Sequence, residues 1–497
     1  MGVLADVLSA SFARHRDLSA VELPAQGSSL SYGDLFDAAQ RWALRYPDTD
    51  RVLVLHIEKS LAYYQFLAAA FTYGRSFCPI DILNPVGRVD AIVRQLDRAI
   101  IITDQADRVE ALRALGHEVD LIDSSHLGPT SPATLAPDTH IVAGDDARYF
   151  MSTSGTTGVP KLVEVRHDAT VKFIGWSLPF YDVGPGDRWA QFSNIGFDLN
   201  LVDFLTAIGG GATLVGLTTL GETTKLNKFV DEQRITHWHS VPSVTRYLLR
   251  GGRPLSELRV LSFCGEPLLR EQCVALRAAL PTARIINTYG PTEGPLFCTA
   301  HEVSELDLAD ETLTTMPIGT PIPGWELDLV DDDQGTRIVL RGVMLAEGYH
   351  GIDDPAFGDA IVNGKPGRSF DTGDYVRQHG RHLCFAHRRD SVVKVNGIRI
   401  DLGEVTDACL RSGFGDPVVL TSAGRLVVFY EAFDGVDAPL DDAALVEVSR
   451  RLQARLPLYA VPSAFEFIEA LPRSATGKVD RSALAKQLSL PSDGSDD

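Results

Sequence analysis

The sequence of 497 residues lacks features that would each point to a particular class of protein. Basic residues are scarce, since 46 Lys and Arg stand against 66 Asp and Glu, whereas binding to nucleic acid or anionic membranes needs a basic surface. There is no apolar run of about 18 residues, and the first residues lack the basic start and apolar core of a signal peptide. We therefore expect no nucleic-acid partner, no membrane association and a cytoplasmic location.

Paired cysteines are also absent. The six cysteines are scattered without any Cys-x-x-Cys pair, so the sequence predicts neither a zinc site nor a disulfide framework. We expect reduced thiols, most of them buried. A Walker A loop is missing as well, because Lys161 is not followed by Ser or Thr and lies at the wrong spacing from the first Gly of its run.

Short apolar strands alternate with longer helical patterns through the first part of the chain. Residues 51–56, 99–103 and 212–216 are predicted strands, and residues 61–70 are a predicted helix. This alternation predicts α/β layers with mainly parallel sheets. From about residue 318, short strands separated by Gly and Asp turns predict a β-rich segment.

A charged break near residues 387–390 precedes a segment with a pattern of its own. Residues 418–421 and 426–430 are predicted strands and residues 440–456 a predicted helix, enough for a small α+β domain. The last residues are polar, and we expect them to be disordered.

The predicted fold class is thus α/β in a chain of two domains and a tail. Residues 1–388 form a large N-terminal domain of two α/β layered subdomains plus a β-rich subdomain. Residues 389–488 form a small, mobile C-terminal α+β domain, and residues 489–497 are the disordered tail.

A run rich in glycine and hydroxyl side chains, Met-Ser-Thr-Ser-Gly-Thr-Thr-Gly-Val-Pro-Lys, occupies residues 151–161. Its glycines let the backbone wrap closely around an anion, and the hydroxyls and Lys161 add donors and positive charge. By composition alone, an ordinary polar hairpin loop explains this run equally well.

Three further polar motifs follow. In residues 287–293, Asn-Thr-Tyr-Gly-Pro-Thr-Glu, Tyr289 can stack on a base and Glu293 can hold Mg²⁺. In residues 370–374, Phe-Asp-Thr-Gly-Asp, an ionised Asp374 can accept hydrogen bonds from paired ribose hydroxyls. The fourth motif places Lys478 on a Gly-containing loop. Each of them alone is more typical of an ordinary turn or a solvated loop than of a functional site.

In this order, and with the triplet Arg-Arg-Asp at 388–390, the motifs resemble the adenylate-forming superfamily. Its members include the adenylation domains of nonribosomal peptide synthetases, acyl-CoA synthetases and firefly luciferase. The resemblance covers nearly the whole chain and extends to residues 73–81, 346–349 and 456–462. The chain departs from the family pattern at Leu162 and His387, where Gly is usual.

The resemblance implies ATP and Mg²⁺ as cofactors and a role for each motif. Asn287 and Tyr289 would bind adenine, and Asp374 and Arg388 the ribose, while the hydroxyl-rich run would close over the phosphates. Glu293 would be the metal ligand. The implied catalytic residues are Lys478, Glu293 and Thr156, and the implied hinge is Asp390. The implied ATP or AMP contacts are Thr153, Ser154, Gly155, Thr157, Gly158, Lys161, Gly265, Asn287, Thr288, Tyr289, Gly290, Thr292, Asp374 and Arg388.

Residues 194–199, Asn-Ile-Gly-Phe-Asp-Leu, bear on the substrate class. In amino-acid-activating members of the superfamily an Asp after Phe pairs with the substrate ammonium, so Asp198 favours an amino acid. Asp198 is also a candidate N-cap for a helix over 199–207, and both roles are compatible. The implied substrate pocket consists of Asp198, Leu199, Val202, His239, Ser262, Cys264, Thr288, Leu296 and Phe297.

Apart from Asp198, this pocket holds no charged residue unless His239 is protonated. A charged substrate side chain would be left unpaired there, so an apolar or aromatic side chain is expected. His239 either packs in the core or hydrogen-bonds a substrate hydroxyl.

The resemblance therefore implies a ligase that converts an amino acid to its aminoacyl-AMP and passes it to the phosphopantetheine thiol of a separate carrier protein. The pocket suits an apolar or aromatic β-amino acid, as in stand-alone enzymes of macrolactam assembly. Three alternatives stay open: a stand-alone enzyme for an α-amino acid, an acyl- or aryl-CoA ligase of the same fold, and an inactive adenylate-fold protein used for binding.

Overall fold

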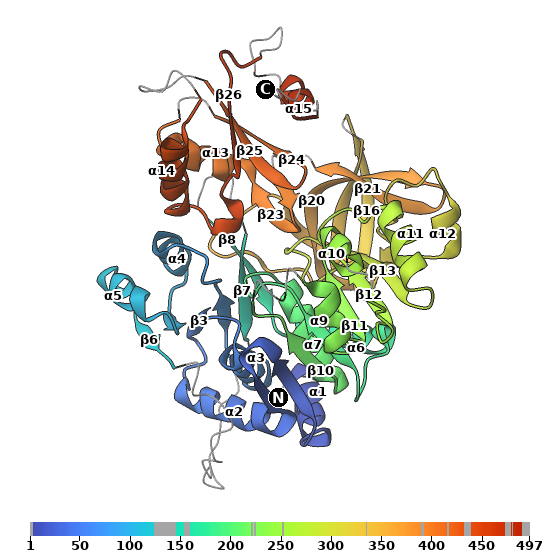
Figure 1. The fold of residues 1–497 in the computed structure, drawn as a ribbon. Coiled ribbons are helices and arrows are strands. Elements are labelled where there is room, and N and C mark those ends of the chain that lie inside the picture. The colour runs from blue at the N-terminus through green and yellow to red at the C-terminus, as the bar shows by residue number, and fades with distance from the viewer. Residues whose placement is uncertain are drawn as a thin grey trace. The chain divides into compact units, whose positions relative to one another are not determined.

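The computed structural model describes most of the chain in two compact units. The described residues are 3–123, 146–153, 160–219, 222, 225–250, 253–333, 335–388, 392–414, 417–431, 439–472, 479 and 481–489. The larger unit takes its described residues from Met1–Ile82, Val93–Thr153 and Leu162–Arg389 (Figure 1). The smaller unit takes its described residues from Leu83–Ile92, Ser154–Lys161 and Asp390–Asp497.

A nine-stranded sheet in the larger unit has the order β15-β14-β13-β12-β11-β9-β10-β1-β2. Its strands are parallel from β13 to β1, with antiparallel strands at both edges. Every residue of β11 and β12 is buried. The residues of β12 are mainly apolar, as expected of a strand covered on both faces, whereas β11 carries two histidines and a serine that need buried hydrogen-bond partners. The strands are β1 (Ser19–Leu23), β2 (Ser28–Ser31), β9 (Arg188–Gln191), β10 (Thr213–Gly216), β11 (His237–Ser240), β12 (Val260–Phe263), β13 (Arg284–Tyr289), β14 (Thr299–Glu302) and β15 (Thr320–Pro321).

The larger unit contains a second sheet, with seven strands in the order β18-β8-β7-β4-β3-β5-β6. Its strands from β7 to β6 run parallel. The helix α3 (Leu61–Tyr73) is buried at every position, which explains its apolar character all round. The strands are β3 (Val52–His56), β4 (Phe77–Pro79), β5 (Ala99–Thr103), β6 (Val119–Leu121), β7 (Arg148–Thr153), β8 (Lys161–Arg166) and β18 (Gly348–Tyr349).

The β-rich segment predicted after residue 318 forms an antiparallel sheet of order β16-β17-β20-β19, with β21 paired to β20. Its strands are β16 (Trp325–Asp332), β17 (Gly335–Gly342), β19 (Phe357–Val362), β20 (Lys365–His379) and β21 (His382–Arg388). The prediction of a β-rich segment is confirmed, although β20, with 15 residues, is longer than the short strands expected. The sheet matters for the site because Asp374, within β20, pairs in the strand register with Arg388, the last residue of β21.

The helices of the larger unit frame these sheets. They are α1 (Val3–Arg14), α2 (Tyr32–Arg45), α3, α5 (Ala106–Ala114), α6 (Ala169–Tyr181), α7 (Leu199–Gly210), α9 (Leu226–Glu232), α10 (Thr245–Leu249), α11 (Arg270–Ala279) and α12 (Glu305–Ala309). The helix α4 (Val86–Val93) falls almost entirely in the smaller unit.

The smaller unit contains the α+β elements expected after residue 390. They are β22 (Val392–Val395), β23 (Ile398–Asp401), α13 (Leu402–Arg411), β24 (Val418–Ser422), β25 (Arg425–Tyr430), α14 (Asp442–Gln453), β26 (Ala464–Phe467) and α15 (Arg481–Ser489). The helix expected over 440–456 is shorter than predicted. Asp441 caps it, accepting a hydrogen bond from the Ala444 amide at 2.8 Å, and fixes its first turn.

The packing confirms two expectations about the core. All six cysteines lie within the described residues, where they are buried and form no disulfide. The predicted strands at residues 51–56, 99–103 and 212–216 are present as β3, β5 and β10. Within the described residues, no helix combines the length and the apolar character that crossing a membrane requires.

Candidate active site

Three residues predicted to contact the nucleotide meet in the larger unit. Tyr289 ends β13, Asp374 lies on β20, and Arg388 ends β21 opposite Asp374 in the strand register. The Tyr289 hydroxyl donates to Asp374 Oδ2 at 2.7 Å, and Arg388 Nη1 lies 3.2 Å from Asp374 Oδ1. Burial, and then the charge of Asp374, raises the pKa of Tyr289 well above its ordinary value, so the phenol stays protonated and donates.

Asp374 keeps acceptor capacity in spite of these contacts. Its side chain is 3% exposed, and its Oδ1 accepts no hydrogen bond of good geometry from the described residues. A buried carboxylate oxygen that accepts no well-formed hydrogen bond is stabilised by an additional hydrogen-bond donor, and the hydroxyl groups of a ribose can donate in this way. The residues present therefore fit the sugar of a nucleotide.

Glu293, the predicted metal ligand, is fully buried beyond the end of β13. The hydroxyl of Tyr349, on β18, donates to Glu293 Oε1 at 2.5 Å, and the Ala346 amide donates to the Glu293 carbonyl at 3.0 Å. The motif at 346–349, which carried no assigned role in the sequence, thus orients this carboxylate. Mg²⁺ in proteins is commonly bound by one or two carboxylates together with phosphate oxygens, and a single oriented carboxylate fits that ligand set.

The other predicted nucleotide contacts near β13 are fixed by backbone partners. The Asn287 amide donates to the Pro317 carbonyl at 2.8 Å, and the Thr288 hydroxyl donates to the Phe263 carbonyl at 2.9 Å. Gly290 is required by packing, because a Cβ there would lie 2.7 Å from the Phe297 Cα. Gly265, just after β12, has a φ of +95°, and Thr292 is half-buried between Pro291 and Glu293.

The ends of the hydroxyl-rich run are described, but its centre is not. Thr153 is the last residue of β7 and Lys161 the first of β8. The predicted contacts Ser154, Gly155, Thr156, Thr157 and Gly158 lie outside the described residues, as do the predicted hinge Asp390 and the predicted catalytic Lys478.

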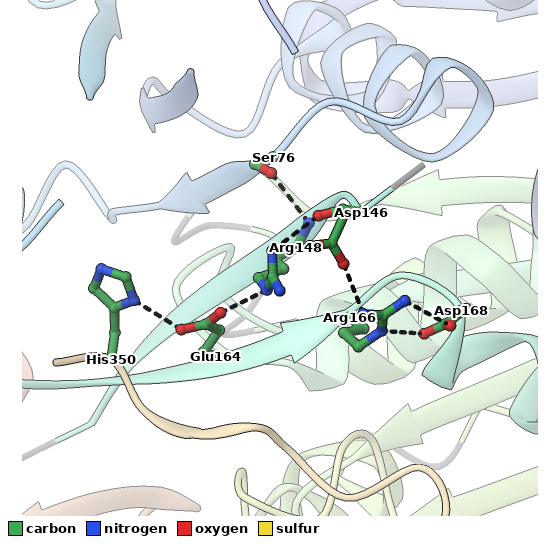
Figure 2. A network of polar contacts seen from close by, with 7 residues as sticks. All are labelled: Ser76, Asp146, Arg148, Glu164, Arg166, Asp168 and His350. Carbon is green, nitrogen blue, oxygen red and sulfur yellow. Dashed lines mark hydrogen bonds and ion pairs between the residues drawn. The ribbon is translucent and has the colours of Figure 1, made fainter. Parts of the chain in front are cut away.

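At the other end of β7 and β8, charged side chains tie the two strands together (Figure 2). Arg166 pairs with Asp146 at 2.7 Å and with Asp168 at 3.1 Å, and Arg148 pairs with Asp146 at 2.8 Å. These contacts stabilise the base of the strand pair from which the hydroxyl-rich run extends.

Glu164, in β8, extends this network to Arg148 at 2.5 Å and to His350 at 2.7 Å, as Figure 2 shows. The Arg148 amide also donates to the Ser76 hydroxyl at 3.1 Å. A cavity of about 470 Å³ opens beside the network. Because these charged lining residues pair with one another, we assign the network to holding the strands. The cavity is lined by Thr49, Asp50, Val52, Ser76, Leu96, Asp97, Arg98, Asp146, Ala147, Arg148, Phe150, Glu164 and His350.

The predicted substrate pocket gathers around α7 and the carboxyl ends of β11 to β13. Asp198 occupies the N-cap position of α7, as predicted, but its side chain forms no capping hydrogen bond. Burial is the main reason that the pKa values of Tyr149 and Cys298 are raised, and the negative charge of Asp198 raises both further. The carboxylate is therefore not used by the helix end. Leu199 is half-buried, and the buried members of the set are Val202, His239, Ser262, Cys264, Thr288, Leu296 and Phe297.

Several of these side chains touch. His239 and Ser262 are neighbours in the register of β11 and β12. Phe297 packs edge-on against His239, with ring centroids 6.0 Å apart, and against Phe173 at 4.9 Å. Leu296 has a φ of +70°, a strained conformation for a side chain with a Cβ, of the kind that clusters at functional sites.

A polar cluster that the sequence analysis did not identify lies behind this pocket. Asp203 of α7 is fully buried and accepts hydrogen bonds from Trp189 Nε1 at 2.9 Å and His239 Nδ1 at 3.1 Å. Burial raises the pKa of Asp203, and the contacts with His239, Trp189 and Lys59 oppose that effect. The signal was present in the sequence: an Asp within an apolar helical run must find a buried partner.

Comparison with known proteins agrees with this geometry. The family model described as "AMP-binding enzyme" matches residues 8–350. The chain is 33% identical over 468 residues to a protein of Pseudomonas fluorescens named L-proline--[L-prolyl-carrier protein] ligase, covering 88% of this chain and 89% of that protein. A protein of the same name from Streptomyces coelicolor is 31% identical over 485 residues, covering 89% of this chain and 88% of its own.

Among solved structures, the chain resembles an NRPS protein containing adenylation and PCP domains, bound to a vinylsulfonamide inhibitor. The TM-score is 0.80 at 26% identity, covering 98% of this chain and 84% of that one. The family match spans more than half of the chain, and it includes the elements that carry Asp198, His239 and Glu293. The chain is therefore an enzyme that belongs to the AMP-binding, adenylate-forming family.

Proposed function

We propose that this enzyme uses ATP and Mg²⁺ to activate an amino acid as its aminoacyl-AMP and then transfers the aminoacyl group to the phosphopantetheine thiol of a separate carrier protein. The observation that carries the proposal is the buried Tyr289–Asp374–Arg388 cluster, in which Asp374 Oδ1 retains acceptor capacity. The carrier-protein ligases among its relatives support the acceptor.

In the first step, a substrate carboxylate oxygen attacks the α-phosphorus of ATP and pyrophosphate leaves. Such a transfer depends mainly on positioning and on neutralising charge. Asp374 and Arg388 would hold the ribose, and the ring of Tyr289 would lie against the adenine. Glu293, oriented by Tyr349, would hold Mg²⁺, whose charge supports the phosphate oxygens.

The remaining catalytic assignments follow the family pattern. Thr153, Lys161 and the run between them would close over the β- and γ-phosphates. Lys478 would supply positive charge between the substrate carboxylate and the α-phosphate. We assign residues 1–388 to the core and residues 389–488 to a lid that turns about Asp390, bringing Lys478 in for adenylation and withdrawing it for thiol transfer.

Asp198 would bind the substrate ammonium. It stands at the head of α7 beside Leu199, it makes no capping hydrogen bond, and the rest of the predicted pocket is mainly apolar. A carboxylate beside mainly apolar side chains interacts favourably with a cation such as the substrate ammonium. Within the amino acids, we propose a β-amino acid with a largely apolar or aromatic side chain.

The test is pyrophosphate exchange into ATP, measured over α-amino acids, β-amino acids and the matching plain acids. We expect exchange with amino acids only, and we expect Asp198→Ala to abolish it. Asp328→Ala, an exposed carboxylate on β16, is the matched control and should exchange normally. Turnover of plain acids with coenzyme A at the rate of the amino acids would refute the proposal in favour of an acyl-CoA ligase.

A further inference from the structure

We propose that the carboxylate of Asp198 is held in position by two asparagines of its own segment, Asn194 and Asn200. The side chains that fix these asparagines are Tyr63 of α3 and Asp81, which follows β4. This inference rests on the proposed function, in which Asp198 binds the substrate ammonium. It adds the positioning residues on which that recognition depends.

The backbone at Asp198 explains why its side chain does not cap α7. An N-cap residue normally has extended φ and ψ angles, which aim its side chain at the amides of the first turn. Asp198 instead has the helical values φ −63° and ψ −22°. The chain is already wound before α7 begins, because the Phe197 amide donates to the Asn194 carbonyl at 3.2 Å. The contacts that keep this turn wound therefore also decide where the Asp198 carboxylate lies.

Asn200, in the first turn of α7, supplies two of these contacts. Its side-chain amide donates to the Ile195 carbonyl at 3.0 Å and also to the Phe197 carbonyl. Its Oδ1 accepts a hydrogen bond from the Tyr63 hydroxyl at 2.5 Å, and both side chains are buried. A single buried side chain thus ties the start of the helix to two carbonyls of the residues that precede Asp198.

Tyr63 determines which way the Asn200 amide group faces. Burial raises the pKa of Tyr63 well above its ordinary value, although the contact with Asn200 opposes this effect, so the phenol stays protonated and donates. A donor at Oδ1 leaves the amide hydrogens of Asn200 for carbonyl acceptors, and its two other partners are carbonyls. Removing the hydroxyl would leave a buried oxygen without that donor and remove the contact that orients the amide.

Asn194 secures the beginning of the segment. Its side-chain amide donates to Asp81, and its Oδ1 accepts from the Gly196 amide at 2.9 Å. Asp81 is buried and ends the stretch at 73–81, which shares the family resemblance but carried no assigned role in the sequence. Because the segment is held at both ends, it presents Asp198 in one position.

The position of this carboxylate matters for substrate binding because an ion pair depends on distance and direction. A displacement of about 1 Å at a reacting or binding group can lower an enzymatic rate by about 100-fold. Burial is the main cause of the raised pKa of Cys298, and the charge of Asp198 adds to it. Since Cys298 follows Phe297, the carboxylate lies near the predicted substrate pocket.

The experiment measures recognition of the ammonium separately from catalysis. Two sulfamoyl-adenosine ligands are compared by calorimetry, one carrying the best amino acid found by pyrophosphate exchange and the other the same acid without its amino group. The ratio of their dissociation constants is the ammonium preference. For the wild type we expect the ligand with the ammonium to bind at least about 30-fold more tightly, as expected for a charge that pairs with a protein carboxylate.

Three variants test the positioning residues. Tyr63→Phe removes one hydrogen bond and should lower the ammonium preference about 3- to 10-fold. Asn200→Ala removes both carbonyl contacts and should lower it about tenfold or more. Asn194→Ala should act in the same direction. In pyrophosphate exchange, all three should raise the KM of the amino acid while the KM of ATP stays within about twofold of wild type.

Tyr32→Phe is the matched control. Tyr32 is also completely buried, and its hydroxyl donates to the Ala212 carbonyl at 2.7 Å, away from the Asp198 segment. Its loss should lower stability about as much as the loss of the Tyr63 hydroxyl, but leave the ammonium preference unchanged. The double variant Tyr63→Phe, Asn200→Ala should match Asn200→Ala alone, because Tyr63 acts through Asn200.

An unchanged preference in Tyr63→Phe or in Asn200→Ala would overturn the inference. Equal loss of affinity for the two ligands would also overturn it, because that result indicates only a general loss of structure. Full additivity in the double variant would contradict the action of Tyr63 through Asn200. If the wild type binds both ligands equally, Asp198 does not bind the ammonium, and the proposed amino-acid specificity fails together with this inference.

Discussion

Replacing Asp374 by Ala tests two properties of the Tyr289–Asp374–Arg388 cluster: that its ion pair is buried from solvent, and that the contributions of its side chains to stability depend on one another. The Asp374 side chain is 3% exposed and that of Arg388 9%, so the substitution leaves a nearly buried guanidinium without its carboxylate. Breaking a buried ion pair by removing one partner costs about 3–5 kcal/mol. Asp328→Ala removes a carboxylate that is 45% exposed and pairs with Arg341, and should cost less than about 1 kcal/mol.

The assay exploits the distribution of tryptophan. All five tryptophans lie in the larger unit, so their fluorescence during urea unfolding reports on that unit without a signal from the smaller one. We expect Asp374→Ala to lower the free energy of unfolding of the larger unit by about 3–5 kcal/mol, and Tyr289→Phe, which removes a hydrogen bond to a charged group, by about 1.5–3 kcal/mol.

The double variant Asp374→Ala, Tyr289→Phe supplies the decisive comparison. Because the Tyr289 hydroxyl has already lost its acceptor in Asp374→Ala, the two losses should fall short of additivity by about 1 kcal/mol or more. A loss below about 1 kcal/mol for Asp374→Ala, or strict additivity, would refute the reasoning that the cluster is buried and coupled.

Three further outcomes are expected. Burial lowers the pKa of His167 to about 3. Below about pH 6.5 the imidazole is therefore protonated in the unfolded chain but stays neutral in the folded chain. The free energy of unfolding should fall by about 1.4 kcal/mol per pH unit as the pH drops from about 6.5 toward 3. His167→Phe should therefore remove about 2 kcal/mol of the stability loss between pH 7 and pH 5 in urea titrations, and an unchanged loss would contradict the assignment. Gly290→Ala places a Cβ 2.7 Å from the Phe297 Cα, so it should cost about 1–3 kcal/mol and raise the KM of the amino acid more than that of ATP in exchange assays. Tyr349→Phe removes the 2.5 Å hydrogen bond to Glu293, and we expect a higher Mg²⁺ concentration for half-maximal exchange; an identical Mg²⁺ titration would count against Glu293 as the metal ligand.

The strands and the order of the motifs were predictable because each depends on a short stretch of chain. Apolar runs such as residues 99–103 form strands wherever they are buried, and β5 has these same bounds. The start of α14 was not predictable to the residue, because it depends on whether the Asp441 side chain accepts a hydrogen bond from the Ala444 amide.

The candidate site was only partly predictable for a different reason. The sequence indicated two roles for Asp198, capping a helix and pairing with the substrate ammonium. The structure shows that its side chain forms no capping hydrogen bond. The sequence also indicated Glu293 as a ligand, but gave no sign that Tyr349 orients it from a strand 56 residues away.

The sequence by itself determined the resemblance of this chain to adenylate-forming enzymes, because the motifs that carry Glu293, Asp374 and Lys478 occur together and in the order of that family. The tertiary structure alone decided which polar groups are paired and which remain available. Asp203 and His239 are 36 residues apart, and Tyr289 and Asp374 are 85 apart. Contacts of that range arise only when the sheets pack, since a hydrogen bond depends on where two strands end in space and not on the residues next to either of them.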